Sequence, residues 1–389
     1  MAAESRFITA DRIHDGRRFL PQGSVLELAA DRSIVAIHEE DYRDIAEHFR
    51  GVLCPGFVNA HCHLELSHML GVIPQGTGLI PFLQAVTRQR AGFSDEQKAA
   101  ARLEAFRQMG DKGVVAIGDI ANTTDTQDLR SSGSIRIHTF VECIGFTEIG
   151  AAARLANSAE LLDNFRSANV AGMAESIAPH APYSVSAGLF RLISGQEPGS
   201  IISIHNQECR AEAEYYQSKT GAVRDLLEGF GIDDSFFVPS GKSSLQSYLP
   251  LISEDHPLIL VHNTYSSKED IQFAQRRPAA VYWCLCPGAN LYIEGRLPDV
   301  IMLVATTANI CIGTDSLASN SQLDIFAELQ LLKAAFPMLS WEELLCWATA
   351  NGAAALGMQH HVGSFRIGSS PGVVHISSLE TDGKARRLI

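Results

Sequence analysis

Two histidines that lie two residues apart, His61 and His63, carry the clearest chemical signal in the sequence. On a β-strand, residues i and i+2 point to the same face, so the two imidazoles would lie side by side at the end of an apolar run. Neutral imidazole is a good ligand for Zn²⁺ or Fe²⁺. Two further histidines, His205 and His262, end later apolar runs, and Asp315 ends the last one. The pattern therefore predicts a site for a divalent metal ion more strongly than an isolated pair of histidines would.

These residues occur within a repeated arrangement, a short apolar run that ends in a polar side chain. Eight runs of this kind end at His61, Asp119, Glu142, His180, His205, His262, Cys286 and Asp315. Charged, helix-favouring stretches lie between most of them, and strands that alternate with helices indicate parallel βαβ units. Eight such units predict an α/β fold, a (β/α)₈ TIM barrel over residues 55–354, with the active-site groups at the C-terminal ends of the strands.

Each of these residues also has a plain structural interpretation. His205 could be a core histidine, Glu208 could be a solvated residue near a helix N-terminus, and Asp315 could cap the following helix. Polar residues also follow strands simply because loops are polar. That alternative does not explain why the set is rich in histidine.

The two ends of the chain have a different pattern. Residues 1–54 contain short β segments separated by turn residues, and residues 355–389 return to a β-like pattern in GSFRIGSSPGVVHIS. We expect both ends to combine into one small β-sandwich beside the barrel.

Composition excludes several classes of protein. Hydrophobic residues make up 46% of the 389 residues and charged residues 19%, which excludes wholesale disorder. The net charge of −13 argues against a nucleic-acid or anionic-membrane surface, because either requires a basic footprint. The eight cysteines form no CxxC pair, and the charged N-terminus lacks the apolar stretch of a signal peptide. We therefore expect a soluble, cytoplasmic protein; a small-molecule substrate is what the family resemblance described next implies.

Six ordered motifs give the chain a resemblance to a known family. They are PGFVNAHCHLELS (55–67), PHAPYSVS (179–186), HNQE (205–208), VHN (261–263), CPGANLYI (286–293) and GTDSLASN (313–320). Together they resemble the amidohydrolase superfamily, in its mononuclear aminohydrolase branch. That branch includes S-adenosylhomocysteine, guanine, cytosine and aminodeoxyfutalosine deaminases and the triazine chlorohydrolases. The HLELS and GTDSLASN segments resemble the aminodeoxyfutalosine deaminase-like sequences.

The resemblance implies a role for each matching residue. His61, His63, His205 and Asp315 would bind one divalent metal ion, Zn²⁺ in first place with Fe²⁺ as the alternative. Glu208 would be the acid/base glutamate, and His262 would orient or help to deprotonate the metal-bound water. His180 would face the substrate. Binuclear relatives carry a bridging lysine near the end of the fourth strand. Here the fourth strand ends in SIAPHAPYS, which favours a single metal ion.

The implied chemistry is hydrolytic deamination of an aminated nitrogen heterocycle or its nucleoside. A bound Zn²⁺ lowers the pKa of its water to about 7, so that hydroxide is available at neutral pH. Asp315 and His262 could accept the proton of that water, and Glu208 could protonate a ring nitrogen and then help the amine to leave. General acid/base help of this kind contributes about 10²–10⁴-fold.

Four further residues are candidate substrate contacts. Glu65 follows the histidine pair, and Gln75 and Phe82 lie in the stretch after the first strand, which covers the substrate in related enzymes. Glu142 ends the third strand, where some nucleoside-active relatives have a basic residue. An acidic group there would repel a substrate carboxylate, which weakens the case for S-adenosylhomocysteine.

Two alternatives stay open. The same metal site could release chloride or cleave an amide, although Glu208 favours an amine because that leaving group must be protonated. A non-catalytic barrel scaffold is the remote alternative, since such a relative would be expected to lose metal ligands. The fold also makes a homodimer the usual expectation.

Overall fold

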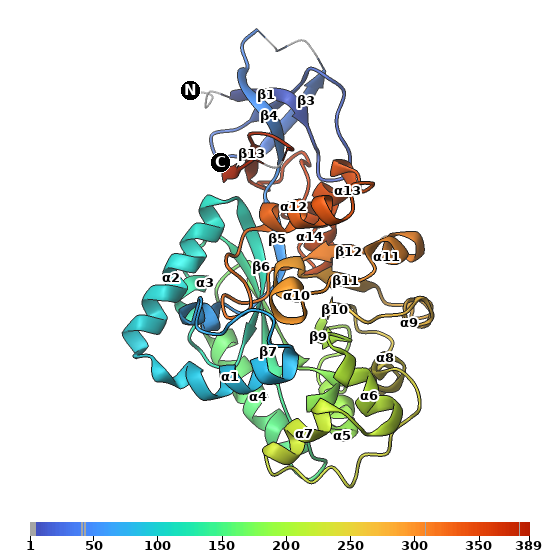
Figure 1. Ribbon diagram of the computed structural model, residues 1–389. Coiled ribbons are helices and arrows are strands. Elements are labelled where there is room, and N and C mark those ends of the chain that lie inside the picture. Colours follow the sequence, from blue (N-terminus) through green and yellow to red (C-terminus); the bar gives the residue numbers. More distant parts are fainter. Residues whose placement is uncertain (1–4, 40–41, 43, 308, 381) are drawn as a thin grey trace.

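Eight parallel strands carry the residues that the sequence singles out (Figure 1). The structure is a computed structural model, which describes residues 5–39, 42, 44–307, 309–380 and 382–389. The strands are β5 (Phe57–Cys62), β6 (Val114–Ala121), β7 (Arg136–Cys143), β8 (Ala174–Pro179), β9 (Ile202–Asn206), β10 (Leu258–His262), β11 (Val281–Leu285) and β12 (Ile310–Ile312). The order of these strands along the chain is the order that the sequence predicts.

The strands form two four-stranded halves that meet along two seams. One half has the order β5-β6-β7-β8, and the other has the order β12-β11-β10-β9. At one seam Cys62 and Asp315 form a parallel bridge, and at the other the His205 amide donates to the His180 carbonyl at 3.0 Å. The predicted α/β barrel is thereby confirmed.

Helices surround the strands (Figure 1). They are α1 (Leu79–Gln89), α2 (Asp95–Asp111), α3 (Gln127–Arg130), α4 (Ala151–Ser167), α5 (Ala187–Ser194), α6 (Arg210–Ser218), α7 (Ala222–Gly229), α8 (Ser244–Tyr248), α9 (Lys268–Ala274), α10 (Pro287–Glu294), α11 (Val300–Thr306), α12 (Ile325–Ala335), α13 (Trp341–Cys346) and α14 (Gly352–Ala355). Local sequence fixes several of their starts. Ser94 and Gln97, for example, form a capping box at the start of α2, which satisfies backbone donors that the helix leaves unpaired.

The barrel has two apolar layers. Val58, Ala60 and Ile259 belong to a buried cluster inside the ring of strands, whereas Phe57 and Leu258 pack with helix residues outside it. Because both faces of the strands are buried, the strand sequences are nearly continuous apolar runs.

Both ends of the chain combine in one sheet at the top of Figure 1. The strands are β1 (Arg6–Ile13), β2 (Ser24–Leu28), β3 (Ile34–Glu39), β4 (Glu47–Pro55), β13 (Val373–Ile376) and β14 (Ala385–Arg387). Their order is β14-β13-β4-β1-β2-β3, so the C-terminal hairpin pairs with β4 at the edge of the N-terminal strands. The sequence predicts a sandwich from both ends. In the described residues the two ends build a single six-stranded sheet.

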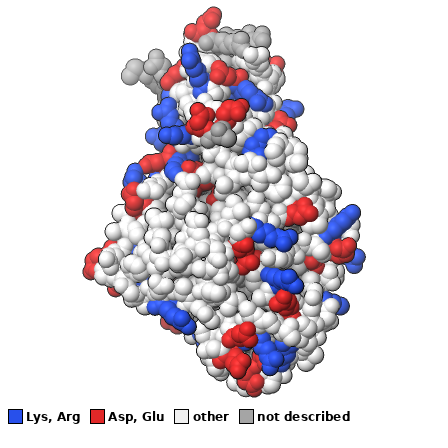
Figure 2. Space-filling model, in the orientation of Figure 1, with Lys and Arg blue, Asp and Glu red and all other residues white. Residues whose placement is uncertain are grey.

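The surface and the helices add two general observations. In Figure 2 basic and acidic side chains are interspersed over the visible face, with no broad basic area. Among the described residues, no helix has both the length and the apolar character that a bilayer span requires.

Candidate metal centre and active site

Five side chains from four strand ends converge at the C-terminal mouth of the barrel. Donor atoms of His61, His205, His262 and Asp315 all lie within 4.8 Å of one another. His63 belongs to the same group, because its Nε2 lies 3.3 Å from Asp315 Oδ1 and 3.3 Å from His205 Nε2. All five side chains are buried. We call these five residues the imidazole cluster.

An irregularity in β5 aims the first two histidines. In a regular strand Ala60 and Cys62 would face the same side, yet Ala60 packs inside the barrel and Cys62 packs in the outer layer. The pairing of β5 with β6 shifts register between Asn59 and Cys62, which is where this change of facing occurs. Bulges of this kind re-aim side chains next to active sites. His61 and His63 consequently point into the mouth.

Left-handed backbone aims two other members of the cluster. Ile259 and Val261 face the barrel interior, so regular alternation would turn His262 outward. His262 instead has φ of +73°, and Asp315 at the end of β12 has φ of +59°. Such conformations cost about 1–3 kcal/mol in residues other than glycine and persist only where the surroundings impose them. His205 needs no such device, because Ile202 and Ile204 face outward and period-two alternation turns His205 inward.

Hydrogen bonds fix which atoms face the centre of the cluster. His205 donates from Nδ1 to the His180 carbonyl at 2.6 Å, which leaves its Nε2 lone pair free to bind a metal ion. His262 donates from Nδ1 to Asn290 Oδ1 at 2.9 Å. Asp315 accepts from the Ser319 hydroxyl through Oδ2 at 2.5 Å, while its Oδ1 lies 3.6 Å from His61 Nε2.

The donor set fits a divalent cation. Both ring nitrogens of His61 are buried without a hydrogen-bond partner, which is costly unless something else binds them. Burial lowers the pKa of His63 to about 3, so its imidazole is neutral and can coordinate. Burial opposes ionisation of Asp315, but the nearby His61, His63 and His262 side chains outweigh it and hold the pKa of its carboxyl group well below its usual range. Neutral imidazoles around one carboxylate form a ligand set that suits Zn²⁺ or Fe²⁺.

Glu208 lies beside this cluster without belonging to it. Its Oε1 is 3.6 Å from His262 Nε2, and burial raises its pKa to about 7. The preceding residue, Gln207, has φ of +48°. Two acidic side chains hold it in place. Its backbone N–H donates to Glu212 Oε1 at 3.0 Å, and its side-chain Nε2 donates to Asp270 Oδ2 at 2.9 Å. A carboxyl group that titrates near neutral pH suits both halves of acid/base catalysis.

Two more carboxylates, Glu65 and Glu142, lie close to the cluster, since donor atoms of Glu142, His180 and His205 are within 4.8 Å of one another. Asn122 donates from Nδ2 to Glu65 Oε1 at 3.0 Å and to Glu142 Oε2 at 2.8 Å, and its backbone amide donates to Glu65 Oε2 at 2.9 Å. Burial raises the pKa of both carboxyl groups, to about 7 for Glu142. We call Glu65, Asn122 and Glu142 the bridged carboxylates.

The cluster and the bridged carboxylates line one cavity of about 190 Å³, which we call the catalytic cavity. Of the predicted substrate contacts, Glu65, Phe82, Glu142 and His180 line this cavity. Burial lowers the pKa of His180 to about 4, and its Nδ1 lies 2.6 Å from the Ser184 hydroxyl oxygen. Gln75 is exposed in the loop before α1 and is not among the lining residues.

Sequence reasoning missed the residues that orient the site. Asn290 and Ser319 stand inside the quoted motifs CPGANLYI and GTDSLASN, so polar residues within those motifs were the available signal. Asn122 follows β6 directly and could have been found by the rule that active-site groups end barrel strands. Glu212 and Asp270 lie on helices, and nothing in their local sequence indicates their contact with Gln207.

Known proteins share this architecture. The chain is 27% identical over 314 residues to an aminodeoxyfutalosine deaminase of a Nitratiruptor species, a match that covers 79% of this chain and 75% of the relative. A crystal structure of Helicobacter pylori aminofutalosine deaminase in complex with methylthio-coformycin superposes with a TM-score of 0.79 at 22% identity, covering 95% of this chain and 91% of that one. An adenosine deaminase from Xanthomonas campestris with bound zinc superposes with a TM-score of 0.73 at 23% identity, covering 95% and 84%.

The family assignment rests on a broader match. The sequence profile of the amidohydrolase family matches residues 52–383, which includes every barrel strand and the strand β13 of the terminal sheet. The chain belongs to the amidohydrolase family.

Proposed function

We propose that this protein is a metal-dependent aminohydrolase that removes the amino group of an aminated nitrogen heterocycle, with an adenine-type nucleoside as the leading substrate. The observation that carries the proposal is the position of Glu208, a buried carboxyl group 3.6 Å from His262 at the edge of the imidazole cluster. The names of the relatives support the adenine-type substrate, since they include aminodeoxyfutalosine, adenosine and 5'-deoxyadenosine deaminases.

His61, His63, His205 and Asp315 would hold the metal ion, for which we propose Zn²⁺. His262 also has a donor atom within reach of His61, His205 and Asp315. We assign the ligand role to His63 because its Nε2 faces both Asp315 and His205, whereas His262 Nε2 faces Glu208. When bound, such an ion lowers the pKa of a coordinated water to about 7.

The residues of the chain would then move protons in sequence. His262 and Asp315 accept the proton of the attacking water. The Glu208 carboxyl donates a proton to the ring nitrogen next to the attacked carbon, which makes that carbon electrophilic, and afterwards helps to protonate the leaving amine. His180, Phe82, Glu65 and Glu142 would contact the substrate from the other walls of the cavity.

The position of Glu208 also favours an amine over chloride as the leaving group. Chloride leaves without a proton, whereas an amine must be protonated, and Glu208 is a carboxyl group positioned for that task. The test is an ammonia-release screen of zinc-loaded protein against adenine, guanine, cytosine, pterins, their nucleosides and an amino-chlorotriazine. Ammonia from an adenine-type compound supports the proposal. Chloride release without ammonia would replace it with the chlorohydrolase alternative.

Three further proposals concern the whole molecule. We propose that residues 55–354 form the catalytic domain and that residues 1–54 and 355–389 form the flanking domain. The eight free cysteines support a reducing compartment, for which we propose the cytoplasm. A homodimer is the expected assembly, and the molar mass in solution, measured by light scattering, tests it.

A further inference from the structure

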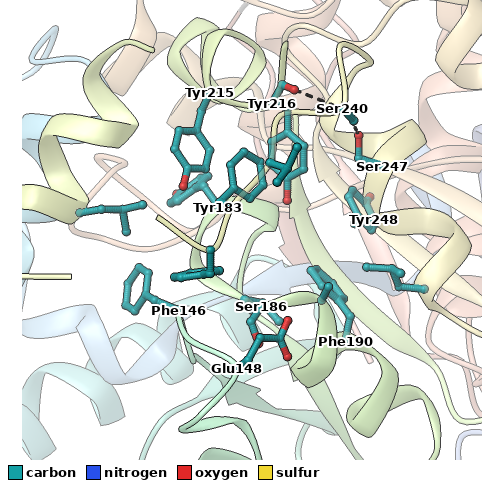
Figure 3. Close-up of a pocket in the computed structure, with 17 residues that line it drawn as sticks. Phe146, Glu148, Tyr183, Ser186, Phe190, Tyr215, Tyr216, Ser240, Ser247 and Tyr248 are labelled. Carbon is teal, nitrogen blue, oxygen red and sulfur yellow. Dashed lines mark hydrogen bonds between the residues drawn. The ribbon is translucent and has the colours of Figure 1, made fainter. Parts of the chain in front are cut away.

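Asp119 on β6 is a strand-end carboxylate that takes no part in the walls of the active site. Ile117 and Ala121, two residues to either side, pack in the outer layer of the barrel, so period-two alternation turns Asp119 outward as well. The described residues that line the catalytic cavity do not include Asp119, nor do those that line the second cavity, whose tyrosine and phenylalanine rings Figure 3 shows. Any role of Asp119 in the chemistry is therefore indirect.

The Asp119 carboxylate holds the backbone at the start of the 3₁₀-helix η1 (Leu64–Met69). Its Oδ1 accepts from the Leu64 backbone N–H at 3.0 Å, and both residues are fully buried. The first N–H groups of a helix have no partner within the helix itself. His63 directly precedes η1, but its side chain makes no capping hydrogen bond. Asp119 therefore supplies the cap from a neighbouring strand.

A second hydrogen bond ties the same two segments in the opposite direction. The backbone N–H of Asn122, directly after β6, donates to Glu65 Oε2 at 2.9 Å. The end of β6 thus accepts from the main chain of η1 and donates to a side chain of η1. Leu64 lies between His63 and Glu65 in the chain. The two bonds consequently hold a proposed metal ligand and a wall residue of the catalytic cavity in a fixed relation to β6.

The direction of the His63 ring depends on this backbone more than that of His205 does. His205 donates from Nδ1 to the His180 carbonyl at 2.6 Å, the kind of outer hydrogen bond that usually orients a metal-binding imidazole. In the described part of the chain, His63 Nδ1 makes no such bond, while its Nε2 faces His205 and Asp315. The main chain at His63 must therefore supply the orientation that a hydrogen bond supplies to His205.

A carboxyl group at this position is unfavourable for packing alone. Burial raises the pKa of Asp119 to about 7, although the hydrogen bond from Leu64 and the charge of Arg102 oppose that shift. The second oxygen of Asp119, Oδ2, is buried without a hydrogen-bond partner. An apolar side chain would avoid both penalties. The acceptor oxygen for Leu64 is what an apolar side chain could not provide.

We propose that Asp119 is a positioning residue for the metal centre, which caps η1 through the Leu64 N–H and thereby directs His63 toward the other ligands. This inference rests on the proposed function for the role of His63 as a metal ligand. It requires an acceptor oxygen at position 119 and does not require a charge there. Asp119→Asn should therefore preserve the site, and Asp119→Ala should impair it.

Zinc affinity, measured by competition with a chromophoric chelator, tests the proposal. We expect Asp119→Ala to weaken Zn²⁺ binding by about 10–100-fold, the effect typical of losing an outer hydrogen bond that orients a ligand. Asp119→Asn should stay close to the wild type. Asp299→Ala is the matched control, because Asp299 also accepts a backbone N–H at the start of a helix, that of Met302 at 3.0 Å on α11. Its zinc affinity should be unchanged. Wild-type affinity in folded Asp119→Ala protein would overturn the proposal.

Two further readouts separate positioning from a general loss of structure. The visible absorption bands of Co²⁺-loaded protein report the ligands around the ion. They should change in Asp119→Ala and match the wild type in Asp119→Asn and Asp299→Ala. In a double-mutant cycle, Asp119→Ala should have little further effect on zinc affinity once His63→Ala is present. Equal losses in the two backgrounds would contradict a route through His63.

Two other proteins cover the remaining outcomes. If Asp119→Ala does not fold, an ester in place of the Leu64 amide removes the same hydrogen bond and keeps every side chain. It should also weaken zinc binding, and wild-type affinity in the ester protein would overturn the proposal. Asp315→Asn tests the metal centre itself. Loss of zinc in Asp315→Asn without any loss in Asp119→Ala refutes the positioning role alone, whereas wild-type zinc binding in Asp315→Asn refutes the proposed metal site.

Discussion

The imidazole cluster and the bridged carboxylates line one cavity, but they satisfy their polar atoms to different degrees. In the bridged carboxylates the Asn122 amide donates to both Glu65 and Glu142, so that the acidic side chains are held by a neutral donor from the chain itself. In the cluster, both ring nitrogens of His61 lack a hydrogen-bond partner, and His63 Nε2 lies 3.3 Å from both Asp315 Oδ1 and His205 Nε2.

The difference indicates which region gains more from a bound cation. Buried polar groups are costly when they are unpaired, so we expect a cation among its donors to stabilise the imidazole cluster. In the bridged carboxylates Asn122 holds Glu65 Oε1, Glu65 Oε2 and Glu142 Oε2, whereas Glu142 Oε1 is buried without a partner. Four predictions test this contrast, from the largest expected effect to the smallest.

The first prediction concerns the acidic group next to the cluster. Glu208→Gln should lower the rate of ammonia release by about 10²–10⁴-fold, because the amide cannot donate and accept the proton that the reaction needs. The zinc content, measured by mass spectrometry of the metal, should stay at the wild-type level, since Glu208 is not among the proposed ligands. Glu214→Gln on α6, a partly exposed substitution, is the control and should keep full activity. Near-wild-type turnover in Glu208→Gln would remove this residue from the mechanism.

The second prediction concerns the cation itself. Removing the metal with a chelator should lower the free energy of unfolding. The expected decrease is about 2.7 kcal/mol, compared with protein kept in a free metal concentration 100 times the Kd of the metal. Thermal melting before and after zinc is restored measures the difference. Asp315→Asn should melt at the same temperature with and without zinc, whereas Glu208→Gln should keep the wild-type response. Identical melting of chelated and zinc-loaded wild-type protein would contradict the assignment of the cluster as a metal site.

The third prediction concerns the bridge that Asn122 forms between Glu65 and Glu142. Asn122→Leu removes two hydrogen bonds and leaves the buried carboxylates of Glu65 and Glu142 without this donor. We expect the free energy of unfolding to fall by about 1–3 kcal/mol, with the zinc content unchanged. Urea unfolding measures the loss, and Asn309→Leu at an exposed position should change stability by less than about 0.5 kcal/mol. A loss of zinc in Asn122→Leu would show that the two regions are not independent.

The fourth prediction concerns a histidine outside both regions. His138 on β7 is buried, lies 2.9 Å from the Ser176 hydroxyl oxygen, and has its pKa lowered by burial to about 4. Between pH 6.5 and pH 4 the unfolded chain binds a proton that the folded protein does not, so folding stability contributed by neutral His138 is lost as the pH falls through this range. Between pH 7 and pH 5.5 the loss is about 1 kcal/mol. In His138→Gln, the decrease in the free energy of unfolding between pH 7 and pH 5.5 should be smaller than in the wild-type protein by this amount. An equal change in both proteins would exclude this histidine as a source of the pH dependence.

The sequence predicted the barrel and the main members of its site because both leave local traces. Parallel strands that are buried on both faces must be apolar along their whole length, and the charged stretches between them mark helices. The rule that active-site groups end barrel strands then selects His61, His205, His262 and Asp315 without any contact information. Gln75 shows the limit of this reasoning. It follows the first barrel strand, as a substrate contact could, but its side chain is exposed.

The sequence by itself determined the types and the order of the residues that could bind a metal ion, since each one ends a recognisable apolar run. The tertiary structure alone decided where their donor atoms point. The register shift in β5 and the positive φ of His262 and Asp315 break the regular alternation of strands, and they are maintained by contacts between segments far apart in the chain. The Asn122 bridge likewise depends on residues from different βα units. A local pattern cannot encode such contacts, because they exist only after the barrel has closed.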